Sequence, residues 1–526
     1  RQKPRDIATA IADQLRGEGS PFERVEVAGP GFINLTLGAA AVTGATARLF
    51  TDARFGVEAP AAATRVVIDY GSPSMGKEMH IGHLRSSVIG DALARVLRFA
   101  GYEVVPQNHI GDWGTHFGML LEQLIDAGWD QTSDHSLADL NRLYREAKAH
   151  FDADPAFAER SRRRVVKLQS GDEQSLAFWR MLIDESCAHM YQVFARLGVL
   201  IAPEDLRGES FFNDRLPLIV NDLRQQGLLV ESDGAQVVFP AGFTGKSGDP
   251  LPLIVQKSDG GYGYAATDLA AARFRANELG GKRLIYVVDA RQSDHFAMVF
   301  SVVRAAHWIA DDVSLEHVAF GTILGADKKP FKSRSGDTVK LSEVLDEAVA
   351  RARAALTERD RDLPADELDR VANAVGLGAV KYADLSSDRI KDYVFDYDRM
   401  LALEGNTAPY LQYAYVRVQS ILRRAGDERY GADRISITDP VERALMLLLL
   451  RFPRVIEQVV RSLEPHRLCN YLYELASQVH QFHERCPVLK APDTGTRQSR
   501  LALSDLAGRA LRLGLELLGV SVVEKM

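Results

Sequence analysis

A strand, a loop of small residues and an amphipathic helix follow one another between residues 66 and 105, and they constrain the fold more than any other feature. The run Val66-Val67-Ile68 is typical of a buried strand, and the helix after the loop opens with His80-Ile81-Gly82-His83. Apolar residues then recur with a helical period of 3.6 from 89 to 100, until Gly101 ends the helix. A second apolar run follows, which completes a β-loop-α-β unit of the parallel, doubly wound type.

The start of this helix has the chemistry of an anion site. His80 and His83 are three residues apart and therefore share one helix face. Free backbone N–H groups and the positive end of the helix dipole gather at the same point, which suits it to hold a triphosphate. Gly82 has no side chain, so a flat adenine can lie against the backbone there. The unit therefore predicts a nucleotide-binding site.

The rest of the chain divides around this unit. Polar helices predict an insertion after the second strand, strand signals return at 252–256 and 284–288, and the chain is almost purely helical from about 340. We expect an α/β multidomain protein with four parts: a small α+β N-terminal domain at 1–60, a Rossmann-type doubly wound parallel-sheet domain at 61–340 with a helical insertion at about 107–205, a helical connector at 341–405, and an all-α C-terminal domain at 406–526. Because Arg1 leads straight into a helix-like stretch, we expect the N-terminal domain to be incomplete.

Charge is distributed unevenly along the chain. The net charge of −7 gives no overall attraction to polyanions. Residues 410–526, however, hold 17 Lys and Arg against 13 Asp and Glu, a balance of +4 that leaves −11 for the rest. Tyrosines are interleaved with these basic residues, so any surface for nucleic acid is expected on the helical end.

The cysteines and the apolar runs exclude other classes of protein. None of the three cysteines forms a Cys-x-x-Cys pair, so we expect no bound metal and no zinc. The longest apolar run, Ala444 to Leu450, is far shorter than the roughly 20 residues that a membrane span needs. We expect a cytoplasmic protein that does not bind membranes.

Several motifs together carry a resemblance to a known family. The segment from Ser72 to Asp91, with Gly111-Asp112-Trp113-Gly114-Thr115 downstream, resembles the signature region of class I aminoacyl-tRNA synthetases, and of the arginyl-tRNA synthetase family in particular. The similarity extends over essentially the whole chain, through segments at 262–269, 289–292, 328–336 and 406–415. It implies an arginine–tRNA ligase that activates L-arginine with ATP and Mg²⁺ and transfers it from arginyl-adenylate to the 3′ end of tRNA(Arg). It further implies that adenylate formation requires the tRNA; we expect a monomer.

The resemblance also implies which residues carry these tasks. The catalytic and ATP-binding residues would be Lys77, His80, Gly82, His83, Lys332 and Arg334. A carboxylate can accept the planar fork of a guanidinium, so Asp69, Tyr264 and Asp268 would bind that group of arginine. The rest of the amino acid would be contacted by Ser72, Pro73, Ser74, His83 and Gln292. The tRNA would be contacted by Tyr410, Gln412, Tyr413, Tyr415, Arg417, Gln419 and Arg423 in an anticodon-binding domain.

This sequence departs from the family pattern in three places. Ser74 stands where the family usually has Asn, and His116 where it commonly has Gln. The second, Lys-rich signature loop of class I enzymes is replaced by Phe331-Lys332-Ser333-Arg334-Ser335. In the arginyl family a lysine three residues before the first histidine takes over the charge of that loop, and Lys77 occupies this position.

Other functions fit the sequence less well. The segment 261–266 resembles a dinucleotide fingerprint but follows a turn instead of a strand, and Gly245-Lys246-Ser247 lacks the upstream glycine of a P-loop. A cysteinyl enzyme of the same class would need zinc-spaced cysteines, and a glutamyl enzyme a basic pocket where Asp268 offers an acid. A binding protein that kept the fold but lost aminoacylation stays open as an alternative.

Overall fold

The computed structural model describes residues 3–129, 137–245, 247–331, 339–359 and 364–526. At its centre lies a parallel four-stranded sheet with the strand order β4-β3-β8-β9. The strands are β3 (Arg65–Asp69), β4 (Glu103–Gln107), β8 (Arg283–Tyr286) and β9 (Ser314–His317). Since all three pairings are parallel, the carboxyl ends of the strands meet at one edge of the sheet. The doubly wound type predicted from residues 66–105 is confirmed.

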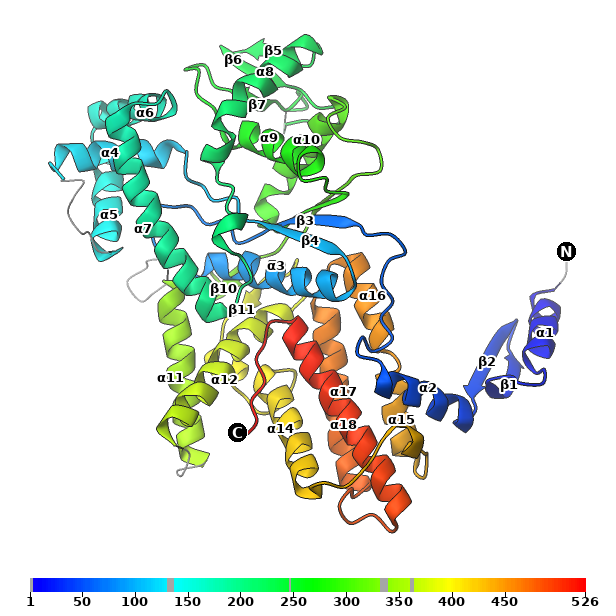
Figure 1. The fold of residues 1–526 in the computed structure, drawn as a ribbon. Coiled ribbons are helices and arrows are strands. Elements are labelled where there is room, and N and C mark those ends of the chain that lie inside the picture. The colour runs from blue at the N-terminus through cyan, green and yellow to red at the C-terminus, as the bar shows by residue number, and fades with distance from the viewer. Residues whose placement is uncertain (1–2, 130–136, 246, 332–338, 360–363) are drawn as a thin grey trace.

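Helix α3 (Gly82–Phe99) lies between this sheet and the helices below it, as Figure 1 shows. Because it is covered on both sides, two of its charged residues, Arg85 and Asp91, are buried. Arg85 forms an ion pair with Asp384 of α12 (Ala365–Leu385), with 3.1 Å between Nε and Oδ2 and at most 1% of either side chain exposed. Asp91 forms an ion pair with Arg95 one turn along the helix. Paired charges therefore fix α3 to its surroundings.

Two insertions separate the halves of the sheet. The first is the predicted helical one: α4 (Thr115–Asp126), α5 (Leu137–Ala153), α6 (Pro155–Gln169) and α7 (Glu173–Leu197). The second contains α8 (Leu216–Gln225) and an antiparallel sheet of β5 (Val230–Ser232), β6 (Ala235–Val238) and β7 (Leu253–Gln256). The strand expected at 252–256 therefore exists, but it pairs within this small sheet instead of the parallel one. Helices α9 (Tyr264–Asn277) and α10 (Ser293–Ala305) then flank β8.

The C-terminal part is helical, as predicted, apart from the short strand β11 (Tyr393–Val394), which pairs with β10 (Ile323–Leu324). Besides α12, its helices are α11 (Leu341–Arg359), α13 (Tyr397–Met400), α14 (Ala408–Ala425), α15 (Pro440–Leu449), α16 (Phe452–Ser462), α17 (His466–Arg485) and α18 (Thr494–Leu517). In the part of the chain that the structure describes, no helix combines the length and apolar character that a membrane crossing requires.

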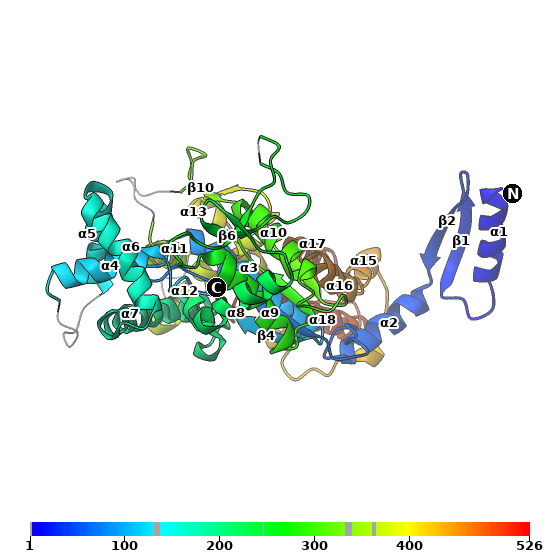
Figure 2. The same ribbon diagram turned by 90° about the horizontal axis from the view of Figure 1, so that it is seen from above.

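A small unit of α1 (Pro4–Leu15), β1 (Phe22–Ala28) and β2 (Phe32–Leu37) stands apart from the rest of the molecule in both views (Figures 1 and 2). Helix α2 (Ala39–Thr51) connects it to the helical part and packs against α15. Arg443 donates a hydrogen bond to the carbonyl of Leu37, and Arg509 donates one to that of Phe50. By its contacts, α2 therefore belongs with the helical part.

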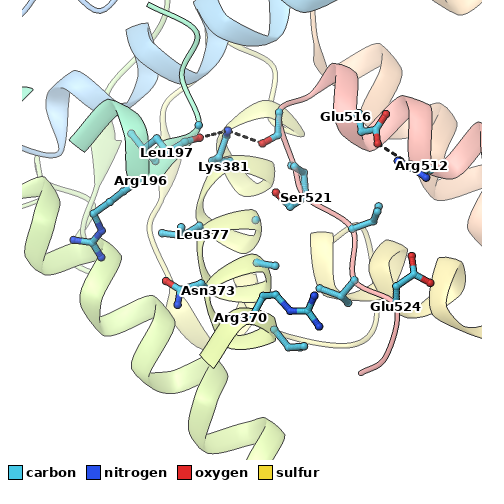
Figure 3. Close-up of a pocket in the computed structure, with 18 of the residues that line it drawn as sticks. Arg196, Leu197, Arg370, Asn373, Leu377, Lys381, Arg512, Glu516, Ser521 and Glu524 are labelled. Carbon is cyan, nitrogen blue, oxygen red and sulfur yellow. Dashed lines mark hydrogen bonds and ion pairs between the residues drawn. The ribbon is translucent and has the colours of Figure 1, made fainter. Parts of the chain in front are cut away.

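A cavity of about 630 Å³ lies where the end of α7, helix α12 and the tail at 519–525 meet (Figure 3). Lys381 of α12 is almost fully buried at its edge and donates hydrogen bonds to the carbonyls of Leu197 and Gly519. Burial lowers the pKa of this lysine to about 8. One side chain thus joins the insertion, the connector and the C-terminal tail.

The Arg85–Asp384 pair predicts a large effect on stability. Arg85→Met leaves Asp384 buried without its cation, which we expect to lower the free energy of unfolding by about 3–5 kcal/mol, measured by urea denaturation. The double variant Arg85→Met/Asp384→Leu removes both charges and should recover most of that loss. Arg451→Met is the control, because the Arg451–Glu474 pair is exposed and should contribute less than about 1 kcal/mol. Equal losses in the two single variants would contradict this account.

Candidate active site

Hydrogen bonds at the start of α3 define the proton positions on the two signature histidines. The backbone N–H of Gly82 donates to Nδ1 of His80, and that of His80 donates to Nδ1 of His83, both at 3.1 Å. An imidazole nitrogen that accepts carries no proton, so each neutral ring has its proton on Nε2. The two rings lie 3.9 Å apart between centroids. The site therefore offers two neighbouring Nε2–H donors.

Both histidines are neutral near pH 7. Burial, and then the charge of Lys77, lowers the pKa of His80 to about 4. Burial lowers the pKa of His83 well below its ordinary value, with His80 and Lys77 adding to the effect. As neutral rings they donate hydrogen bonds without adding positive charge, so the cation that a phosphate needs must come from another residue.

Gly82 also has a steric reason to be glycine. A Cβ at this position would lie 2.8 Å from Cε1 and 2.9 Å from Nδ1 of His80. Any side chain would therefore displace the ring of His80 and break its hydrogen bond to the Gly82 backbone.

Lys77 is a cation close enough to these histidines to lower their pKa values. Its charge contributes to the lowered pKa values of His80, His83 and His116. Burial lowers the pKa of Lys77 itself, and its Nζ lies 5.5 Å from the centroid of the Tyr144 ring on α5. The predicted catalytic residues Lys77, His80, Gly82 and His83 are therefore brought together.

The loop between β3 and α3, which carries the two histidines, is held by backbone hydrogen bonds on two sides. On one side, Met75 donates to the carbonyl of Gly111 at 3.0 Å. On the other, Ile81 donates to the carbonyl of Val339 at 3.0 Å, and Leu341 donates to that of Met79 at 2.9 Å. Lys332 and Arg334 lie outside the described residues. The described chain resumes at 339, beside the signature histidines.

Asp69 is already paired with a guanidinium of the chain itself. It ends β3, and its Oδ2 lies 2.9 Å from Nη2 of Arg275, a buried residue of α9. Its Oδ1 accepts a hydrogen bond from the Ser72 hydroxyl at 2.9 Å. Both carboxylate oxygens of Asp69 therefore have partners within the protein.

Asp268 has a more open arrangement on the first turns of α9. It is 8% exposed, and its Oδ2 lies 2.7 Å from Nε2 of His295. Its Oδ1 faces Nε2 of His109 at 3.9 Å, which is too long for a hydrogen bond. Tyr264 is 65% exposed, and its ring stands edge-on to His295 with 4.8 Å between centroids. His295 therefore contacts both Asp268 and Tyr264.

The residues predicted to contact the rest of the amino acid differ in exposure and conformation. Ser72 has a φ of +40°, a conformation that is uncommon for residues other than glycine and that marks local strain. Pro73 is buried behind it, whereas Ser74 is exposed and forms a β-bridge with Gly111. Gln292 is also exposed, at the end of a short 3₁₀ turn.

Sequence reasoning missed several charged groups here, namely His109, Asp112, Glu209, Arg275 and His295. Asp112 is buried and accepts hydrogen bonds from the backbone and hydroxyl of Ser210. Burial raises the pKa of Glu209 to about 7, against a lowering effect of His109. His109 lies two residues after the end of β4, and Arg275 lies two turns after Asp268; these were the signals available in the sequence. Among the described residues, no group of three His, Cys, Asp or Glu side chains could hold a metal ion.

The residues predicted to contact tRNA lie along α14 but differ in exposure. Gln412 is fully buried and donates hydrogen bonds to the carbonyls of Ala374 and Ser521. Tyr415 is also buried, with its hydroxyl toward Glu524. Tyr413 is exposed. Tyr410, Arg417, Gln419 and Arg423 are half-buried or exposed, and Tyr410 and Arg423 contact His480 and Glu524 respectively.

Three family models match the chain. The catalytic domain of the class I (R) tRNA synthetases matches residues 46–397, and the DALR anticodon binding domain matches residues 411–526. The arginyl tRNA synthetase N-terminal domain matches residues 1–37.

Similar proteins are found over the whole chain. It is 53% identical over 534 residues to an arginine–tRNA ligase of Frankia casuarinae, a match that covers 100% of this chain and 91% of that protein. The crystal structure of arginyl-tRNA synthetase from Plasmodium falciparum has a TM-score of 0.84 at 30% identity, covering 99% of this chain and 89% of that one. The arginyl-tRNA synthetase of Thermus thermophilus has a TM-score of 0.82 at 27% identity, covering 100% and 92%.

The raised pKa of Glu209 predicts how stability depends on pH. Because the folded protein holds this proton up to about pH 7 and the unfolded chain releases it at lower pH, stability should fall as pH rises between these values. Glu209→Gln should reduce the fall by up to about 1.4 kcal/mol per pH unit, measured by urea denaturation from pH 4.5 to 8. Glu204→Gln, at an exposed position, should leave it unchanged. Parallel curves for wild type and Glu209→Gln would contradict this prediction.

Proposed function

The chain belongs to the arginyl-tRNA synthetases, and we infer from this membership that it is an arginine–tRNA ligase. It activates L-arginine with ATP, which enters as its Mg²⁺ complex, and transfers the arginyl group to the 3′ end of tRNA(Arg). The observation that carries this conclusion is the 53% identity to an arginine–tRNA ligase over the whole chain. The roles of individual residues are proposals.

In the first step, a carboxylate oxygen of arginine forms a bond to the α-phosphorus of ATP, and the bond to the departing pyrophosphate breaks. The protein must mainly align the reactants and neutralise developing charge. We assign the two Nε2–H donors of His80 and His83 to the phosphates, with the adenine against Gly82. Lys77 supplies the positive charge that the neutral histidines lack. Lys332 and Arg334 remain assigned to ATP on the resemblance alone.

For the amino acid, we assign Asp268 as the main acceptor of the guanidinium, with Tyr264 beside it. Its Oδ1 faces a histidine nitrogen too distant to donate to it, whereas both oxygens of Asp69 are held within the protein. Asp69 then contributes through the negative potential of the pocket and through its bond to the Ser72 hydroxyl. The remaining contacts to arginine are assigned to Ser72, Pro73, Ser74, His83 and Gln292.

For the tRNA, we assign the exposed face of α14, which presents Tyr413 and Arg423. Gln412 and Tyr415 act indirectly, because they are buried and hold the C-terminal tail. We propose that the small N-terminal unit, which stands apart from the rest of the molecule, contacts the tRNA elbow. We further propose a monomer, because one chain supplies all the residues assigned to the site. As an enzyme of protein synthesis, it would act in the cytoplasm.

We propose that adenylate formation requires bound tRNA, and one experiment tests this coupling together with the substrate. Isotope exchange between pyrophosphate and ATP should occur with arginine and tRNA(Arg), and with no other amino acid. Without tRNA it should fall to background. Exchange at full rate without tRNA would contradict the coupling alone, whereas no exchange with any amino acid would favour a binding protein.

Lys77→Ala should slow adenylate formation by about 10²-fold or more, because it removes the cation beside the neutral histidines. The arginine KM should change little, which steady-state aminoacylation over a range of arginine concentrations would show. Lys148→Ala removes an exposed lysine on α5, paired with Asp152, and serves as the control. A rate equal to that of the control would overturn the role of Lys77.

A further inference from the structure

One histidine touches both of the side chains assigned to the guanidinium. His295 lies on the first turn of α10, with 11% of its side chain exposed. Its Nε2 is 2.7 Å from Oδ2 of Asp268, and its ring meets the edge of Tyr264 at 4.8 Å. Within the site proposed for arginine, His295 is the described residue that contacts both of these side chains.

The hydrogen bond fixes the proton on this histidine. An ionised carboxylate only accepts hydrogen bonds, so the proton must be on Nε2 of His295. The neighbouring His109 has the opposite arrangement, because its Nδ1 bonds to the carbonyl of Arg207 at 2.9 Å and must donate there. Its Nε2 also lies 3.9 Å from Oδ1 of Asp268, too far to donate a hydrogen bond. His295 is the ring that can orient the carboxylate.

The same bond leaves one oxygen of Asp268 for a ligand. A carboxylate held through Oδ2 cannot rotate freely, so Oδ1 keeps a fixed direction. A guanidinium is a planar array of donors whose interaction depends on that direction. Tyr264 is mostly exposed, and contact with the His295 ring limits where its own ring can lie.

We propose that His295 is a positioning residue for arginine, which aims Asp268 and supports Tyr264 without touching the reacting atoms. The proposal rests on the proposed function, in which Asp268 receives the guanidinium. Because other residues are assigned to the phosphates, loss of His295 should weaken arginine binding and leave the chemical step largely unchanged.

The test compares three substitutions of His295. Glutamine places an amide N–H near the position of Nε2, whereas asparagine places it near that of Nδ1, out of reach of Asp268. We expect His295→Ala and His295→Asn to raise the arginine KM by about 10-fold or more, as for a lost hydrogen bond to a charged group. His295→Gln should restore it to near the wild-type value. The ATP KM and kcat should stay within about twofold of wild type in tRNA-dependent aminoacylation.

A matched control separates this role from general packing. His317 on β9 is also half-buried, bonds to the carbonyl of Val288 at 3.0 Å and packs on Phe296, but does not reach Asp268. His317→Gln should leave the arginine KM unchanged. Thermal unfolding of each variant checks that the fold is intact, and if the alanine variant does not fold, the comparison of glutamine with asparagine decides.

Asp268→Asn distinguishes failure of the inference from failure of its premise. It should raise the arginine KM at least as much as His295→Ala. If Asp268→Asn changes nothing, the assigned pocket is wrong. If it raises the KM but the glutamine and asparagine variants of His295 behave alike, the positioning role of His295 is overturned while the pocket stands.

Discussion

The buried ion pair between Arg85 and Asp384 is the contact on which the position of the active site depends. Helix α3 starts at the two signature histidines and runs between the parallel sheet and the helical part, so a shift of the helix would move the histidines directly. Arg85 also donates to the carbonyl of Lys391 and packs on the Tyr393 ring, which gives the guanidinium partners on several sides. Breaking such a pair on one side is costly because it leaves a charge buried alone. The pair therefore specifies one arrangement of the sheet, α3 and the helical part.

The site proposed for arginine follows the same rule of charge compensation. It gathers the acids Asp69, Asp112, Glu209 and Asp268, and leaving all four ionised and unpaired in a buried site would be unfavourable. Three of these acids are stabilised in different ways: Arg275 pairs with Asp69, Ser210 donates to Asp112, and burial favours the protonated form of Glu209. Asp268 has Oδ2 bonded to His295, whereas its Oδ1 faces His109 at 3.9 Å, too far for a hydrogen bond. An acidic pocket with a single free carboxylate matches a substrate side chain with a single positive charge.

Sequence could predict the parts of this site that depend on local order. The strand, the loop and the helix at 66–105 are contiguous, so the relation between Lys77 and the two histidines follows from their spacing. Arg275, His295 and Glu209 could not be assigned to the site in this way, because each contacts a residue that is distant in the sequence. Burial of Gln412 was equally hidden, since only the fold shows that the C-terminal tail covers it. Likewise, the β-pattern at 252–256 predicted a strand but could not tell which sheet would take it.

The strength of these contacts limits where a tRNA could act on the first step. Lys381 and Asp384 lie one turn apart on α12 and tie it to the C-terminal tail and to α3 through buried groups, so α12 and α3 are expected to move as one body. Contact alone does not couple two sites, because coupling requires an element with two arrangements of similar energy. The contact between Lys77 and the Tyr144 ring is much weaker, about 0.5–2 kcal/mol for such a pair. A change in the insertion that carries Tyr144 would therefore move Lys77, the proposed catalytic cation, more easily than a change transmitted through α3.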